Sequence, residues 1–133
     1  MNRLCDLGTV RLETERLILR RFTREDAEAV FWGWTGDSAC ADRCAWRVHP
    51  DPAYTREILE HWIDEYEDNA YNWLVERKDT HELIGNISTV NIKRKHGNCE
   101  LGYCYGSRYW GKGYATEALR HVINFLLDDC RFH

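Results

Sequence analysis

Apolar and polar positions along the chain follow two different periods, which divide it into strand-like and helix-like segments. The strand-like segments are short, rich in β-branched and aromatic residues, and bounded by turn residues. They cover residues 14–22, 71–77, 83–92 and 98–105, with a charged hairpin tip expected at residues 93–97. Apolar residues three and four positions apart instead predict helices over residues 51–66 and 116–129, and a capping-box-like start predicts another over residues 23–34. This order of elements predicts an α+β fold with a mostly antiparallel sheet flanked by helices.

The expected helices have recognisable boundaries. Thr23 and Asp26 form a capping-box-like start, and Asp51-Pro52 supplies an N-cap followed by proline in the first turn. Residues 35–50, between the first two helices, are expected to be irregular. The last helix should bury a stripe that consists of Leu119, Val122, Ile123 and Leu126.

Composition narrows the class of protein without identifying a function. The 133 residues suffice for one domain, expected to span residues 1–133, and 44% of them are hydrophobic and 30% charged. No apolar run is long enough for a membrane span, and the net charge of −4 argues against a nucleic-acid surface. Residues 1–13 are interrupted by charges and lack the apolar core of a signal peptide. We therefore expect a cytoplasmic protein with neither a nucleic-acid nor a membrane partner.

The chain contains six cysteines, and we expect them to be reduced thiols rather than metal ligands. Cys40, Cys44 and His49 form a loose group, but no Cys-x-x-Cys spacing is present and a fourth ligand would have to come from elsewhere. Cys99 and Cys104 are five positions apart on one expected strand, so they should point to opposite faces of the sheet.

One segment carries a specific chemical signal, because a strand, a glycine loop and a helix start follow one another. The strand-like Glu100–Tyr105 leads to Tyr109-Trp110-Gly111-Lys112-Gly113-Tyr114-Ala115-Thr116-Glu117-Ala118. A helix N-terminus offers unpaired N–H groups and positive partial charge, which favour a phosphate. The P-loop sequence is absent, and the dinucleotide fingerprint lacks its third small residue, since Thr116 stands at that position. A phosphorylated cofactor of another kind is therefore expected.

The loop Trp110-Gly111-Lys112-Gly113-Tyr114-Ala115 resembles the coenzyme A loop of the GNAT superfamily of N-acetyltransferases. The family motif is Arg/Gln-x-x-Gly-x-Gly/Ala, and Trp110 departs from it at the first position. With Glu100-Leu101-Gly102-Tyr103 ahead of it, the segment is similar to the RimJ/RimL-type branch, whose members acetylate protein N-termini or small amines. The resemblance extends from about Thr14 to the end of the chain and is strongest over residues 99–119. It implies acetyl-CoA (coenzyme A) as cofactor and a small-molecule amine or a peptide N-terminus as acceptor.

The resemblance also implies which residues form the site. Backbone N–H groups of residues 111–116 would hold the pyrophosphate, and the pantetheine arm would pair with the backbone of Tyr103 and Tyr105. Glu100 would be the general base that takes the proton of the attacking amine, whereas Cys104 is expected to pack and not to act as a nucleophile. The expected cofactor-binding residues are Tyr103, Cys104, Tyr105, Trp110, Gly111, Lys112, Gly113, Tyr114, Ala115 and Thr116.

Compared with the family pattern, the chain is expected to be C-terminally incomplete. Family members continue with a strand, a helix and a closing hairpin, whereas Arg131-Phe132-His133 alone follows the last expected helix. The open sheet edge would then be covered by a second copy in a homo-oligomer, by another chain or by further residues. The alternative to an enzyme is a non-catalytic or partner-completed acyl-CoA-binding domain, and a nucleotide-binding module is a weaker alternative.

Overall fold

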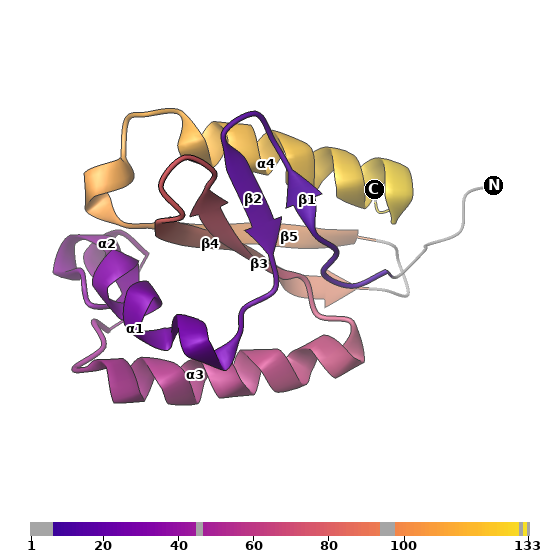
Figure 1. Ribbon diagram of the computed structural model, residues 1–133. Helices are drawn as coiled ribbons and strands as arrows, with labels where there is room; N and C mark the ends of the chain where they lie inside the picture. Colours follow the sequence, from indigo (N-terminus) through magenta and orange to yellow (C-terminus); the bar gives the residue numbers. More distant parts are fainter. Residues whose placement is uncertain (1–6, 45–46, 94–97, 131, 133) are drawn as a thin grey trace.

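A single antiparallel sheet organises the computed structural model, which describes residues 7–44, 47–93, 98–130 and 132 (Figure 1). The strands lie across the sheet in chain order: β1 (Leu12–Glu13), β2 (Leu17–Arg20), β3 (Asn72–Arg77), β4 (Leu83–Lys93) and β5 (Asn98–Tyr105). Every neighbouring pair is antiparallel. The predicted α+β class with an antiparallel sheet is thus confirmed.

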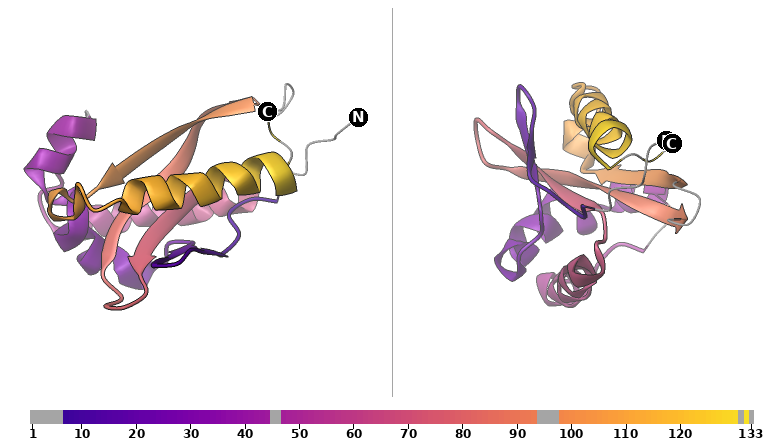
Figure 2. Two further views of the ribbon diagram at one scale, coloured as in Figure 1. Left: turned by 90° about the horizontal axis from the view of Figure 1, so that it is seen from above. Right: turned by 90° about the vertical axis from the view of Figure 1, so that its right-hand side faces the viewer.

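Helices cover both faces of this sheet. They are α1 (Ala27–Val30), α2 (Ser38–Cys44), α3 (Pro52–Glu65) and α4 (Tyr114–Asn124). Short 3₁₀ and π turns adjoin the helices or the loop before α4, at residues 24–26, 31–35, 66–68, 107–109 and 125–129. The end view in Figure 2 shows α4 on one face of the sheet and α1 and α3 on the other. Within the described ranges, no helix has the length and apolar character needed to cross a bilayer.

The first strand was predicted over residues 14–22, and this prediction was wrong at its start. Residues 12–20 form a tight hairpin, in which the N–H of Thr14 donates to the carbonyl of Leu17 (2.9 Å). The N–H of Leu17 donates in return to the Thr14 hydroxyl (3.0 Å). A threonine hydroxyl that accepts from a nearby backbone N–H favours a turn over a continuous strand, so β2 begins only at Leu17.

The predicted starts of the first two helices are confirmed. The N–H and the hydroxyl of Thr23 donate to the carboxylate of Asp26 at 2.8 and 3.0 Å, so this carboxylate closes the first turn. The carboxylate of Asp51 accepts a hydrogen bond from the N–H of Tyr54 at 2.8 Å, as an N-cap does.

Residues 35–50 were predicted to be irregular, and this was wrong because α2 occupies Ser38–Cys44. The carboxylate of Asp37 accepts from the N–H of Ala39 (3.0 Å) and starts the helix, while Cys40 and Ala41 are buried beneath it. A helix of about two turns offers too few apolar repeats for its period to be recognised in the sequence.

The last helix begins at Tyr114, two residues before the predicted start. Gly113 has a φ of +82°, a left-handed conformation that ends the loop directly before the helix. The predicted buried stripe was wrong at Ile123, which is 38% exposed, and Leu119 is only half-buried. The buried positions of this helical segment are Tyr114, Ala118, Val122, Phe125 and Leu126.

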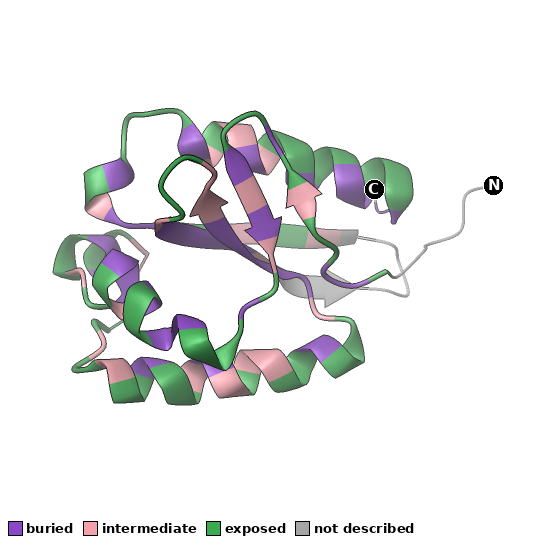
Figure 3. Ribbon diagram, in the orientation of Figure 1, coloured by how far each residue is buried: buried purple, intermediate pink, exposed green. Residues whose placement is uncertain are grey.

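Buried residues form two cores, one on each face of the sheet (Figure 3). Trp73 packs edge to face against Phe125 beneath α4, with ring centroids 5.8 Å apart. On the other face, Trp34 and Leu74 pack beneath the N-terminal helices. Cys99 contacts the first core and Cys104 the second, which confirms that these cysteines point to opposite faces.

The outer strand of the sheet is β5. It pairs with β4 on one side, and on its other side no partner strand occurs among the residues that the structure describes. The hairpin tip expected at residues 93–97 falls mainly on residues 94–97, which lie outside the described part of the chain. The end of β5 lies next to α2 and to the loop that leads to α4 (Figure 1).

Candidate functional site

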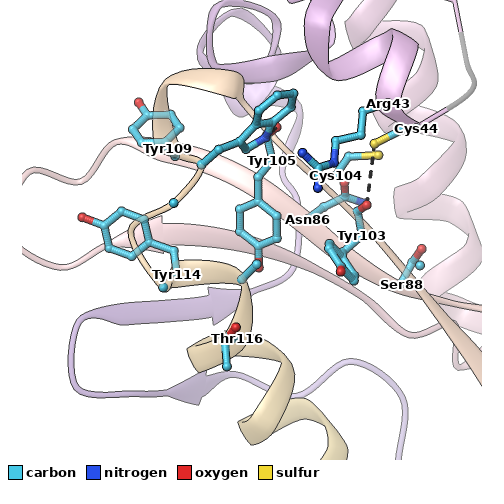
Figure 4. Close-up of a pocket in the computed structure, with 15 residues that line it drawn as sticks. Arg43, Cys44, Asn86, Ser88, Tyr103, Cys104, Tyr105, Tyr109, Tyr114 and Thr116 are labelled. Carbon is cyan, nitrogen blue, oxygen red and sulfur yellow. Dashed lines mark hydrogen bonds between the residues drawn. The ribbon is translucent and has the colours of Figure 1, made fainter.

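A cavity of about 640 Å³ opens along the outer edge of β5 (Figure 4). This volume is in the usual range for small-molecule sites. Four parts of the chain form its wall: α2, the middle of β4, the end of β5, and the loop with the first turn of α4. The lining residues are Arg43, Cys44, Asn86, Ser88, Gly102, Tyr103, Cys104, Tyr105, Tyr109, Trp110, Gly111, Gly113, Tyr114, Ala115 and Thr116.

The backbone of Tyr103 and Tyr105 points outward from the sheet into this region. The N–H of Gly106 donates to the carbonyl of Ile84 across the β4–β5 pair (3.0 Å). Because hydrogen-bonded positions alternate in an antiparallel ladder, Cys104 then faces β4, and the residues on either side of it face away. The edge that a ligand can approach is therefore formed by Tyr103 and Tyr105.

Two side chains already contact this edge. The thiol of Cys44 donates to the carbonyl of Tyr103 at 3.7 Å, and the indole N–H of Trp110 donates to the carbonyl of Tyr105 at 2.8 Å. The guanidinium carbon of Arg43 lies 4.7 Å from the centre of the Trp110 ring. This cation–π contact joins α2 to the glycine loop across the cavity wall.

The loop before α4 is held from both sides. The carboxylate of Asp37 accepts from the N–H and the hydroxyl of Ser107 at 2.8 and 2.7 Å. The hydroxyl of Tyr109 donates to the carboxylate of Glu82 at 2.8 Å, and burial together with this carboxylate raises the pKa of Tyr109 to about 12. The loop therefore enters α4 in a fixed direction, with the N–H groups of the first helical turn lacking acceptors within the helix.

Glu117 clamps the start of α4 to the β1–β2 turn. Its carboxylate accepts from the hydroxyl of Thr14, from the N–H of Arg16 (2.9 Å) and from the Arg16 guanidinium (2.7 Å). The same guanidinium donates to the carbonyl of Lys112 (3.1 Å) and lies over the Tyr114 ring. Partial burial would raise the pKa of Glu117, but the hydrogen bonds from Thr14 and Arg16 outweigh it and lower the pKa.

Tyr105, which lines the cavity, carries a deeply buried hydroxyl. Its side chain is 5% exposed, and its hydroxyl has no hydrogen-bond partner within the described residues. Burial raises the pKa of this hydroxyl, so it stays protonated and able to donate. A buried hydroxyl without a partner is costly, and this one is covered by protein atoms rather than open to the cavity.

The structure brings together every predicted cofactor residue except Lys112, whose side chain is exposed and does not line the cavity. Glu100 is likewise exposed and absent from the cavity wall. It lies on β5 opposite Val90, two positions before Gly102 and on the face of the sheet that carries Cys104. Its role as a general base stays a prediction.

No role in the cavity wall was predicted for Arg43 or Cys44, because no helix was expected in their segment. No role was predicted either for Arg16 or Glu117, which are 101 residues apart in the chain and meet only in the fold. The Thr-Glu pair within the family-like string was the one available signal for Glu117.

The cysteine group differs from the one considered in the sequence. The sulfur atoms of Cys40, Cys44 and Cys104 all lie within 4.8 Å of one another. His49 instead hydrogen-bonds the Thr55 hydroxyl through Nδ1 (2.7 Å), and burial lowers its pKa. A hydrogen bond with Cys104, together with burial, raises the pKa of the Cys40 thiol.

A second cavity, of about 330 Å³, lies on the α3 side of the sheet. The carboxylate-bearing Glu65 and Asp68 line it, together with Asn72 and Thr89. Ser88 lines both this cavity and the first one. Two cavities with a shared wall residue allow two ligands to approach the same stretch of the sheet.

These features agree with comparisons to known proteins. The model of the acetyltransferase (GNAT) domain family matches residues 16–133, and the chain belongs to this family. The uncharacterized N-acetyltransferase YoaA of Bacillus subtilis is 32% identical over 114 residues, which make up 86% of this chain and 64% of YoaA. The chain thus spans less than two thirds of that relative's length.

Solved structures agree with the same fold. A GNAT-family acetyltransferase from Bacillus anthracis is 25% identical with a TM-score of 0.78, over 93% of this chain and 70% of that one. The ribosomal-protein-S5-alanine acetyltransferase of Vibrio fischeri has a TM-score of 0.76 at 23% identity, over 93% of this chain and 70% of that one. At this identity the second likeness shows the fold alone.

Proposed function

We propose that this chain is an N-acetyltransferase domain that binds acetyl-CoA in the 640 Å³ cavity and transfers its acetyl group to a primary amine. One observation carries the proposal: an outward-facing strand edge at Tyr103 and Tyr105 leads directly to a glycine loop and a helix N-terminus. An extended amide-containing arm that ends in phosphates fits this combination, and membership of the GNAT family supports it.

The loop and the first turn of α4 fit the pyrophosphate. Gly111 and Gly113 have φ values of +74° and +82°, which side-chain-bearing residues rarely adopt. A Cβ at Gly111 would meet no described atom within 4 Å, so the backbone there is open to a ligand. The N–H groups at the start of α4 and the positive end of its dipole would face the phosphates. Residues 111–116 are the part of the chain that we assign to this role.

The outer edge of β5 fits the pantetheine arm. An extended chain with amide groups can pair with the backbone of Tyr103 and Tyr105 as an added strand does. The carbonyl of Tyr105 is already taken by Trp110, whereas the contact of Cys44 with the carbonyl of Tyr103 is a weak one at 3.7 Å.

Bound acetyl-CoA would supply the thioester whose acetyl group the amine takes as the thiolate leaves. The attacking amine must first lose a proton, and we assign its acceptance to the carboxylate of Glu100, directly or through a water. The exposed position of Glu100 on β5 leaves room for an acceptor molecule. Ser88 connects the cavity wall to the acidic second cavity, where Glu65 and Asp68 would attract a cationic amine.

For the acceptor, we propose the RimJ/RimL type of substrate, a protein N-terminus or a small amine. The strings Glu100–Tyr103 and Tyr109–Ala118 support this assignment. The shared fold with the ribosomal-protein-S5-alanine acetyltransferase is compatible with it.

The experiment is an incubation of the purified chain with acetyl-CoA and a panel of small amines and short peptides, read by mass spectrometry. We expect one acetyl group to be added to at least one acceptor, and calorimetry to show coenzyme A binding. Binding without transfer to any acceptor would replace the enzyme by an acyl-CoA-binding domain. Absence of binding would overturn the whole proposal.

A further inference from the structure

Three cysteine thiols from two separate elements meet beside the cavity. Cys40 and Cys44 are four positions apart, so they lie on the same side of α2, and Cys104 approaches them from β5. All three sulfur atoms lie within 4.8 Å of one another. Cys40 is fully buried, whereas the other two are half-buried and line the cavity, as Figure 4 shows for Cys44 and Cys104.

We propose that Cys40, Cys44 and Cys104 form a binding site for a thiophilic d¹⁰ metal ion, Zn²⁺ or Cu⁺. Sulfur ligands select these ions over Mg²⁺ or Ca²⁺, which require oxygen. Zn–S bonds of about 2.3 Å place two sulfur ligands about 3.8–4.0 Å apart. The observed upper limit of 4.8 Å exceeds this spacing by at most about 1 Å, which rotamer adjustments can close.

The side of the cysteine cluster that borders the cavity determines how many ligands a bound metal ion can have. Because Cys44 and Cys104 border the cavity, a fourth ligand such as water can reach a bound Zn²⁺ from that side, while Cu⁺ would be complete with three thiolates. Three thiolates around Zn²⁺ carry a net negative charge. The guanidinium of Arg43 belongs to the same cavity wall and would partly balance that charge.

Metal binding would also change the edge of β5. The thiols lose their protons to solvent when they bind the ion, so uptake should weaken as the pH falls. The thiolate of Cys44 can then no longer donate to the carbonyl of Tyr103. The site therefore connects metal uptake to the backbone edge that lines the large cavity, and it does not depend on the proposed acetyl transfer.

The test is a titration of the fully reduced chain with Zn²⁺, Cu⁺ and Mg²⁺ in separate arms, with chelator competition for the affinity. Co²⁺ serves as a spectroscopic probe of thiolate coordination. We expect one equivalent of Zn²⁺ or Cu⁺ to bind, Mg²⁺ not to bind, and Cys104→Ser to weaken binding at least a hundredfold. Cys99→Ser is the matched control, since Cys99 is on the same strand but packs on the other face of the sheet.

Cys44→Ser, at a half-buried position, repeats the test if Cys104→Ser fails to fold, which circular dichroism shows. Binding that survives both substitutions would overturn the proposal, and so would equal losses in Cys99→Ser. Failure of the wild-type chain to bind Zn²⁺ or Cu⁺ would mean that the three thiols only pack against one another.

Discussion

The glycine loop and the outer edge of β5 border the same cavity but are held in place very differently. The loop and the start of α4 are held by hydrogen bonds to distant segments. Ser107 donates to Asp37 and Tyr109 donates to Glu82, while Glu117, in α4, accepts from Thr14 and Arg16 of the β1–β2 turn. The edge of β5 is paired with β4 on one side and faces the cavity on the other. The loop is thus held by side chains from other segments, whereas the edge presents backbone groups toward the cavity.

This difference matches the parts of the cofactor proposed for the two regions, the pyrophosphate for the loop and the pantetheine arm for the edge of β5. Phosphate groups are recognised by donors in fixed positions, and a rigid loop keeps these donors from rearranging on binding. An open strand edge instead accepts any extended amide-containing chain, whether a cofactor arm or another strand. The loop should therefore contribute most to cofactor affinity, whereas Glu100 on the strand should decide turnover.

The largest effect is expected at the strand. Glu100→Gln keeps the shape of the side chain but removes the proton acceptor, so kcat should fall by about 10²–10⁴. Coenzyme A affinity should stay within about twofold, because the loop is unchanged. Steady-state kinetics and calorimetry measure the two values. Glu67→Gln, an exposed site after α3, is the control, and a native kcat in Glu100→Gln across pH 6–9 would remove Glu100 from the mechanism.

The next effect is expected at the loop. Gly113→Val places a β-branched residue at a φ of +82°, which should distort the first helical turn and weaken coenzyme A binding by at least about tenfold. Gly8→Val is the matched control, since Gly8 has a φ of +73° but does not line the cavity. Unchanged calorimetric affinity in a folded Gly113→Val protein would contradict the loop assignment.

A smaller effect, on stability, is expected at Glu117, which joins α4 to the β1–β2 turn. Glu117→Gln keeps the side-chain shape but removes the charge that Thr14 and Arg16 stabilise, which should cost about 1–3 kcal/mol in the free energy of unfolding. Urea unfolding at neutral pH measures this difference. Loss of stability without a matching loss of kcat would show that Glu117 positions the loop and takes no part in acetyl transfer.

The difference in the free energy of unfolding between the wild type and Glu117→Gln should also depend on pH. The folded-state pKa of Glu117 is lowered below its ordinary value of 4.5, so its contribution is present above that value and is lost as the pH falls through the folded-state pKa. The stability gap between wild type and Glu117→Gln should therefore be constant near neutrality and shrink in acid. A gap that grows below pH 4.5 would mean that the sign is wrong.

The smallest expected effect is a shift in association. A homo-oligomer that covers the outer edge of β5 would use the same backbone groups of Tyr103 and Tyr105 as the pantetheine arm. If both form, coenzyme A should move the chain toward the monomer in light scattering at increasing protein concentration. Oligomers that persist unchanged at saturating coenzyme A would show that association uses another surface.

The sequence predicted best where local rules operate. The strand–loop–helix order around Gly113, the helix starts at Thr23 and Asp51, and the opposite orientation of Cys99 and Cys104 all follow from neighbouring residues. It failed where a short element depends on contacts from elsewhere, as in α2, or where a turn depends on one hydroxyl, as at Thr14.

The sequence by itself determined the family, the antiparallel character of the sheet and the loop, because hydrophobic period and glycine position act within a few residues. Tertiary structure alone decided which distant side chains meet. It joined Arg16 to Glu117 and replaced His49 by Cys104 in the cysteine cluster. Such contacts depend on the packing of elements far apart in the chain, and no spacing in the sequence records them.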